Sequence, residues 1–336
     1  MLYVVILFFL VSIYIYCLLG GADFGAGIIE LTSGGKSRDR TISLVSEAMA
    51  PIWEANHMWL IIAVVILFNA FPSVYSTLLV SLSIPLILML IGIILRGSAF
   101  TFRHYDAIID SSQKVYTRVF EYSSLIVPFF FGLVVGSIIS GKITASPSDF
   151  YEGYVAPWLN FFSITVGIFI ASLFSFIASI FLVSESKDKN QAAEFIGRSK
   201  KAIIITVASG ALVFASSVVD GVHFFEAFFG NRLSISLMVL ATVCLPVLWK
   251  VLEKGLKWPA RILVGAQLLF ILGAFYSVYF PTLVRLKDGS ELTFYNSSAP
   301  QVTLDYLGWA LIFGSLIIFP ALIYLFKIFK AGERLS

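Results

Sequence analysis

Few ionisable side chains interrupt the apolar stretches of this 336-residue sequence, and those few are the ones that could do chemistry. Glu54 and His57 are three positions apart, so in a helix they lie on one face, within reach of each other or of a shared water. A buried carboxylic acid and an imidazole can exchange protons, because burial favours the protonated acid and imidazole titrates near neutrality. An ion pair that packs two helices is the alternative interpretation.

A second candidate acid, Asp23, lies in the glycine-rich segment 20–27. Four glycines weaken a helix, but they also permit close packing, or a non-helical turn that neighbouring helices shield from lipid. Asp23 is therefore either a functional carboxylate or a residue that caps or terminates its helix.

The composition places these residues in a membrane protein. Hydrophobic residues make up 59% of the chain and charged residues 13%, against about 25% charged residues in soluble domains, and the mean hydropathy is +0.93. Stretches of about 20 apolar residues, enough to cross a hydrocarbon core of about 30 Å, recur along the sequence. We predict an all-α, polytopic integral membrane protein, with residues 1–336 forming a single transmembrane domain of about nine helices.

The predicted spans are 2–22, 50–71, 74–95, 119–140, 159–183, 202–218, 233–249, 262–281 and 306–326. The second and third are separated only by residues 71–73. We interpret them as two spans joined by a tight turn, because the combined run is about twice the length that one crossing needs. The connection 96–118 is either a short interfacial helix or a solvated link, and Glu121 follows it into the fourth span.

Basic residues are distributed unequally between the two sets of connections that alternate along nine spans. One set holds 19 of the 23 Lys and Arg residues and comprises 30–49, 96–118, 184–201, 250–261 and 327–336. By the positive-inside rule this set is cytoplasmic, so we predict the N-terminus outside and the C-terminus in the cytoplasm. The basic residues form no patch for nucleic acid, and the first span lacks a basic n-region and a convincing cleavage site, so we expect it to be retained.

Ligands for a redox cofactor are scarce. The three His and five Met residues form no paired arrangement suited to haem, and no CxxCH, phosphate-loop, GxGxxG or zinc spacing occurs. Cys17 and Cys244 fall within predicted spans, where a thiol acts as a small packing residue. We expect this chain to bind no metal, and to be incapable of electron transfer by itself.

The acids lie in segments that match a known pattern when taken together. The segments are Ala22-Asp23-Phe24-Gly25, Trp53-Glu54-Ala55-Asn56 with Trp59, Phe71-Pro72 followed by Tyr75, and Leu95-Arg96-Gly97 before Phe100 and Arg103. In combination they resemble the signatures of subunit II of cytochrome bd quinol oxidases, most strongly over residues 15–105. Two departures are Glu54, where the family usually has Asp, and Ala55 with His57, where it usually has Gly and Gln or Glu.

The resemblance implies a fold of two four-helix bundles plus one additional helix, in the plasma membrane of a prokaryote. It implies a haem-free companion to a subunit I that binds two b-type haems and haem d, oxidises quinol near the outside and reduces oxygen to water. Protons would be released outside and consumed from the cytoplasm, without pumping. Further partners would be membrane lipids, quinone and, in some complexes, a small single-helix accessory subunit.

The resemblance also implies roles for individual residues. Asp23 and Glu54 would take up cytoplasmic protons, with His57 adjacent and Asn56 holding water or a carboxylate in place. The remaining residues would pack or line an interface: Trp53, Trp59, Arg96 and Arg103.

Two other classes compete with this interpretation. Secondary transporters also use glycine-broken helices, although midplane polar residues are nearly absent here. A purely structural membrane anchor predicts that an amide at Asp23 or Glu54 leaves turnover intact, whereas proton uptake predicts slow turnover with haem content preserved.

Overall fold

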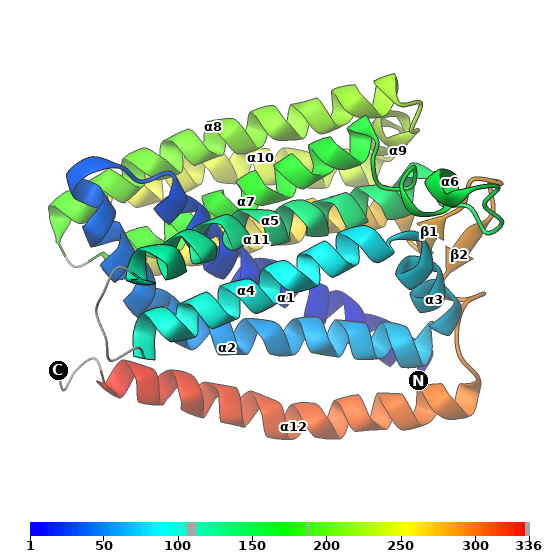
Figure 1. Ribbon diagram of the computed structural model, residues 1–336, viewed down its shortest axis with the longest axis horizontal. Coiled ribbons are helices and arrows are strands. Elements are labelled where there is room, and N and C mark those ends of the chain that lie inside the picture. Colours follow the sequence, from blue (N-terminus) through cyan, green and yellow to red (C-terminus); the bar gives the residue numbers. More distant parts are fainter. Residues whose placement is uncertain (106–111, 187, 333–336) are drawn as a thin grey trace.

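Long helices run along one common axis and account for most of the molecule (Figure 1). The computed structural model describes residues 1–105, 112–186 and 188–332. The long helices are α1 Leu2–Leu31, α2 Arg38–Ala70, α4 Ser83–Tyr105, α5 Ser112–Ser140, α7 Phe161–Glu185, α8 Lys189–Val219, α10 Arg232–Glu253, α11 Lys257–Tyr279 and α12 Gln301–Gly332. The short elements are η1 Gly35–Ser37, α3 Pro72–Ser81, α6 Phe150–Tyr154, α9 Phe224–Gly230, β1 Thr282–Arg285 and β2 Glu291–Thr293.

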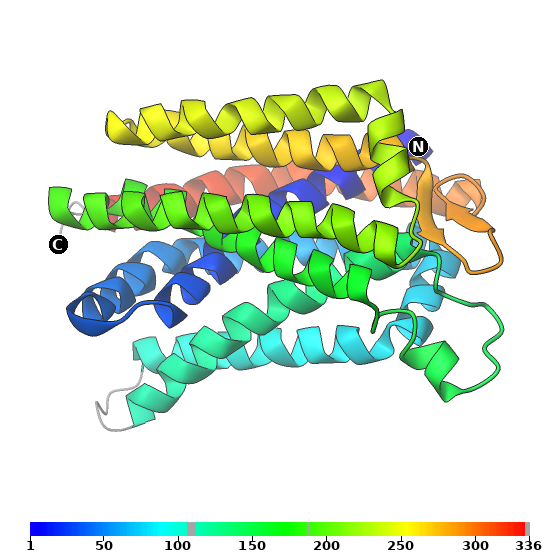
Figure 2. The ribbon, with the colours of Figure 1, turned by 90° about the horizontal axis from the view of Figure 1, so that it is seen from above.

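The predicted all-α, multi-pass architecture is confirmed. Within the described ranges, 8 helices are long and apolar enough to cross a membrane, and α2 with α3 forms a bent pair that brings the number to 9. Figure 2 shows the same helices from a second direction, with α10 and α11 along one side of the bundle. The grouping into two four-helix bundles plus one helix stays a prediction.

The third span begins later than predicted. The chain bends by 113° between α2 and α3, at Phe71, whose backbone is not helical, and Pro72 occupies the first turn of α3. The crossing helix is therefore α4, from Ser83, and the predicted interval 74–95 is divided between α3 and α4. Of the connection 96–118, residues 96–105 extend α4 and 112–118 begin α5, while 106–111 lie outside the described residues.

Helix α1 is surrounded by α2, α5 and α7, and every residue from 20 to 30 is buried. The glycines make this possible: a Cβ at Gly25 would lie 2.0 Å from the Phe174 carbonyl oxygen, and one at Gly27 would lie 2.2 Å from Ser124 Oγ. The helix continues unbroken to Leu31. The glycine-rich segment therefore serves close packing, and Asp23 neither caps nor ends its helix.

Hydroxyl pairs join α7 to α8 within the apolar region. Thr165 Oγ1 lies 2.6 Å from Ser216 Oγ, and Ser172 Oγ lies 2.7 Å from Ser209 Oγ. Small residues at helix contacts let the two helices approach closely. Their hydroxyls form hydrogen bonds across the interface that lipid tails cannot provide.

The end of the bundle that is predicted to lie outside is closed by the antiparallel β1–β2 hairpin. Its buried Phe294 packs on Phe9 and Phe71, and so covers the start of α1 and the bend after α2. Lys287 Nζ contacts Glu152 Oε1 at 2.6 Å, and this hydrogen bond, with others from Ser148, lowers the pKa of Glu152 to about 2. The hairpin is thus attached to the connection between α5 and α7.

Candidate functional site

The innermost ion pair joins Asp23 of α1 to Arg96 of α4. Arg96 Nη2 lies 2.6 Å from Asp23 Oδ1 and 3.0 Å from the Asp23 carbonyl oxygen, and Arg96 Nε donates to Ser124 Oγ at 3.0 Å. Both side chains are at most 1% exposed. The guanidinium carbon also lies 4.7 Å from the ring centroids of Phe24 and Phe120. These contacts replace the water that each charge loses on burial.

A second buried pair lies two helical turns away on the same two helices. Glu30 follows Asp23 by seven positions, and Arg103 follows Arg96 by seven, which corresponds to roughly 10 Å along each helix. Arg103 Nη1 contacts Glu30 Oε1 at 2.7 Å and Arg103 Nη2 contacts Ser46 Oγ at 3.2 Å. The Glu30 side chain is fully buried and that of Arg103 is 6% exposed.

One aromatic ring connects the two pairs. The guanidinium carbon of Arg103 lies 4.4 Å from the Phe120 centroid, and that of Arg96 lies 4.7 Å from it. Phe120 is itself fully buried. Both cations therefore lie over a single ring of α5, where the electron-rich face contributes to their stabilisation.

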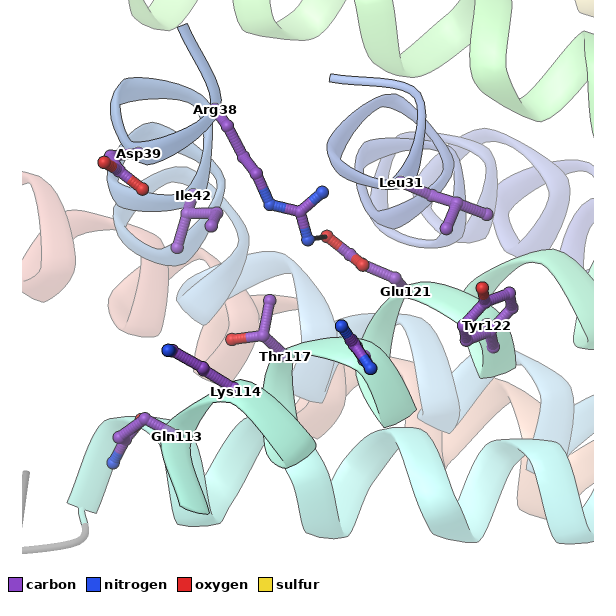
Figure 3. A pocket seen from close by; sticks show the side chains of 10 residues that line it. Leu31, Arg38, Asp39, Ile42, Gln113, Lys114, Thr117, Glu121 and Tyr122 are labelled. Carbon is purple, nitrogen blue, oxygen red and sulfur yellow. Dashed lines mark hydrogen bonds and ion pairs between the residues drawn. The ribbon is translucent and has the colours of Figure 1, made fainter. Parts of the chain in front are cut away.

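The third pair opens to the surface. Arg38 of α2 contacts Glu121 of α5 at 2.6 Å, and Figure 3 shows Arg38 reaching across to Glu121. Glu121 is 2% exposed and Arg38 is 36% exposed. Both line a pocket of about 710 Å³, together with Leu31, Asp39, Ile42, Gln113, Lys114, Thr117, Arg118 and Tyr122.

Several buried polar atoms of this region have no hydrogen-bond partner among the described residues. They are Asp23 Oδ2, Glu30 Oε2, Arg96 Nη1, Arg103 Nε, Trp53 Nε1 and both polar atoms of the Asn56 amide. Buried polar atoms of this kind are where ordered water binds in proteins. The two inner pairs thus keep hydrogen-bonding capacity beyond the ion pair itself.

The predicted site residues are partly brought together. Asn56 lies against α1, because a Cβ at Gly20 would be 3.0 Å from Asn56 Oδ1. The His57 ring is half-buried, 5.7 Å from the Trp53 ring, and within electrostatic range of Asp23 and Arg96. Glu54 belongs to α2, but its side chain lies outside the described residues.

Both tryptophans of the predicted site, Trp53 and Trp59, contact other aromatic rings of this chain. Trp53 lies against Gly97, and its ring is tilted by 34° to the Phe100 ring at a centroid distance of 5.6 Å. The buried Trp59 ring lies 5.9 Å from the Phe319 ring.

Sequence reasoning missed Glu30, and it assigned Arg96 and Arg103 only to packing or an interface. The signal was present: two acids are seven residues apart in one segment and two arginines are seven apart in another. This equal spacing lets each acid meet one arginine when the two helices run in the same direction. Glu121, which the sequence places at the entry of the fourth span, is buried and paired with Arg38.

Haem ligation requires axial side chains that converge, and the described histidines do not. His57 packs on Trp53 inside α2, whereas His223 pairs with Glu226 on the exposed surface of α9. Within the described residues no group of three or more His, Cys, Asp or Glu side chains is arranged to hold a metal ion.

Fold and site together define a polytopic helical membrane protein in which three acid–arginine pairs lead from a surface pocket into the bundle. Sequence comparison identifies the family: the model for cytochrome bd terminal oxidase subunit II matches residues 1–329. The chain belongs to this family and is a subunit of a quinol oxidase complex.

Individual relatives agree. The chain is 25% identical over 298 residues to cytochrome bd ubiquinol oxidase subunit 2 of Bacillus subtilis, covering 87% of this chain and 85% of that one. It is 22% identical over 339 residues to the putative cytochrome bd menaquinol oxidase subunit II of the same organism, covering 96% and 93%. The bd oxidase structure from Geobacillus thermodenitrificans has a chain of the same fold, with a TM-score of 0.77 at 17% identity, covering 97% of this chain and 98% of that one.

Proposed function

We propose that this chain is the haem-free subunit II of the oxidase, that it supports the haem-bearing subunit I, and that it conducts cytoplasmic protons toward the site of oxygen reduction. Subunit I would hold two b-type haems and haem d. Quinol oxidation near the outside would release protons there, so the complex builds proton-motive force without pumping. The N-terminus would lie outside and the end of α12 in the cytoplasm.

The observation that carries this proposal is the row of acids Glu121, Glu30 and Asp23. The first lines a pocket at the predicted cytoplasmic end, and the others lie progressively deeper in the bundle. Arginine does not deprotonate, so each guanidinium stabilises its carboxylate and leaves the acid as the group that gains and loses the proton. Glu30 and Asp23 each keep one unpartnered oxygen for such a transfer.

Water molecules must complete the route. Direct proton transfer needs heavy atoms within about 3 Å, whereas Asp23 and Glu30 are separated by two turns of α1, roughly 10 Å. The unpartnered atoms of Arg96, Arg103 and Asn56 are suited to hold those waters. Beyond Asp23, we propose that His57, Asn56 and Glu54 continue the path toward subunit I.

The alternatives have less support. A transporter built on a glycine-broken helix does not fit α1, which is continuous and closely packed at its glycines. A purely structural anchor explains the buried ion pairs, but it does not require an acid at the floor of a solvent-accessible pocket.

Glu121→Gln is the sharpest test, because its partner Arg38 is 36% exposed and can be solvated when left alone. We expect proton uptake and quinol-dependent oxygen consumption to slow by roughly tenfold or more, in line with the loss of one proton-transfer group, with haem d absorbance unchanged. The complex should be studied in proteoliposomes, where uptake from each side is measured with a pH dye.

Glu185→Gln is the matched control. Glu185 also pairs with an arginine, Arg261, at the same end of the bundle, and it lies outside the row of acids. This variant should behave as wild type. If both variants assemble with full haem content and consume oxygen at the wild-type rate, Glu121 does not conduct protons. Equal slowing of both would point to a general loss of charge.

A further inference from the structure

A stripe of graded polarity runs along α5 beside the pocket. Lys114, Arg118 and Tyr122 are spaced by four residues and therefore lie on one helical face. Leu125 and Ile126 continue that face, and they are 37% and 40% exposed. The stripe passes from cationic through aromatic to aliphatic, as expected of a surface that crosses from headgroups into hydrocarbon.

The pocket lining carries a net positive charge, because its three basic residues, Arg38, Lys114 and Arg118, outnumber its two acidic ones, Asp39 and Glu121. Arg38 is neutralised by Glu121, but neither Lys114 nor Arg118 forms an ion pair with a carboxylate in the part of the chain that the structure describes. Figure 3 shows Lys114, Thr117 and Glu121 along the same stretch of α5, below Arg38. The volume of about 710 Å³ falls within the range of small-molecule sites, roughly 300–1,000 Å³.

The position of the pocket favours an amphiphilic ligand. Leu31 and Ile42 give the lining apolar surface beside the charges, and Tyr122, which is 56% exposed, stands where α5 enters its predicted span. A soluble anion would contact only the basic side chains. A phospholipid would contact the basic side chains through its phosphate and the aliphatic stripe through its acyl chains. Basic pockets between membrane helices bind anionic headgroups in this way.

We propose that the pocket between α1, α2 and α5 binds the headgroup of an anionic phospholipid of the cytoplasmic leaflet, with Lys114 and Arg118 contacting its phosphate. The acyl chains would lie along Tyr122, Leu125 and Ile126. The inference concerns binding and does not require that the row of acids conducts protons. Only the choice of leaflet rests on the predicted orientation.

The test uses the intact oxidase complex, delipidated in detergent and titrated with spin-labelled phosphatidylglycerol, with motionally restricted label as the readout. Lys114→Gln combined with Arg118→Gln should weaken binding by at least roughly tenfold, since each basic residue near an anionic lipid surface contributes about 1 kcal/mol. Haem d absorbance confirms assembly without reporting on turnover.

Lys250→Gln combined with Lys254→Gln is the matched control, because it removes the same charge at the same predicted side but from the end of α10. The control should bind phosphatidylglycerol as wild type does, and phosphatidylcholine should bind both complexes equally weakly. Equal loss in both double variants would overturn the site. Displacement of the lipid by sn-glycerol 3-phosphate at similar concentration would overturn the lipid assignment in favour of a soluble phosphate.

Discussion

Asp23 and Arg96 must be considered as one unit, because each is the other's main compensation for burial. Removing one partner of a buried pair costs about 3–5 kcal/mol, whereas replacing both with apolar or neutral groups is often tolerated. Arg96 is 1% exposed, so its guanidinium cannot turn to bulk solvent when its partner is lost. The substitution Asp23→Asn therefore affects the stability of the folded complex as well as any proton transfer.

We expect Asp23→Asn alone to reduce assembly of the complex, because a buried guanidinium is left without a counter-charge. The double variant Asp23→Asn with Arg96→Met should recover much of the assembly but still turn over slowly, since it lacks the acid. Haem d absorbance and thermal stability report the first effect, and oxygen uptake per haem reports the second. Full turnover of the assembled double variant would show that no acid is needed at this position.

The residues of the site were only partly predictable. Asp23 and Asn56 stand inside recognisable motifs, but Glu30 and Arg38 fall in what hydropathy assigns to a connection. Arg96 and Arg103 were counted among the cytoplasmic charges for the same reason. Hydropathy locates the part of a helix that lipid surrounds, whereas α1 and α4 continue past it, and the charged residues on those extensions bury each other.

At the scale of elements, α1 depends on glycine at the positions where other helices approach most closely. The Phe174 carbonyl of α7 occupies the place of a side chain at Gly25. In most helices Gly→Ala is favourable by about 1 kcal/mol, because alanine has the higher helix propensity. The sign should reverse at this contact, since backbone cannot move aside as a flexible side chain can.

We expect Gly25→Ala to lower the thermal stability of the complex and its yield, by forcing α1 and α7 apart. Gly197→Ala is the control, because Gly197 lies within α8 and a Cβ there would meet nothing within 4 Å. That variant should be neutral or slightly stabilising. Differential scanning fluorimetry of the two purified variants checks the difference, and similar melting temperatures would contradict the proposed contact.

The boundaries of α3 and α4 show what sequence periodicity cannot supply. Residues 72–81 are apolar, so hydropathy continues smoothly from α2 to α4, and it cannot register a 113° bend. Pro72 indicated a break, but proline at a first helical position starts a helix as readily as it ends one. The direction of α3 depends on packing against distant elements, such as the Phe71–Phe294 contact.

At the scale of the whole molecule, the start of α1 and the end of α12 lie at opposite ends of the bundle (Figure 1). This arrangement requires an odd number of crossings, as the alternating charge distribution predicts. The number and order of spans were thus readable from composition and charge, because lipid imposes length and the positive-inside rule imposes direction. Helix packing angles and partner choice depend on surface shape, which neither signal encodes.

The predicted orientation can be checked with single cysteines. Ser146→Cys, in the connection between α5 and α7, should react with a membrane-impermeant maleimide in intact cells, whereas Lys254→Cys should react only after permeabilisation. The unmodified chain sets the background, since Cys17 is buried and Cys244 is partly so. The reverse pattern of labelling would invert the orientation.

The arginines that accompany the buried acids also bear on ion leakage. Arg96 and Arg103 place two permanent positive charges over Phe120 in the interior. Each is paired with a carboxylate, so the row offers no free anionic ligands on which a sodium or potassium ion could exchange its hydration water. A proton needs no such ligand shell, because it is carried by bonds to carboxyl groups and water. A bundle that conducts protons along this row would therefore stay sealed to other cations, and the membrane voltage would not be short-circuited.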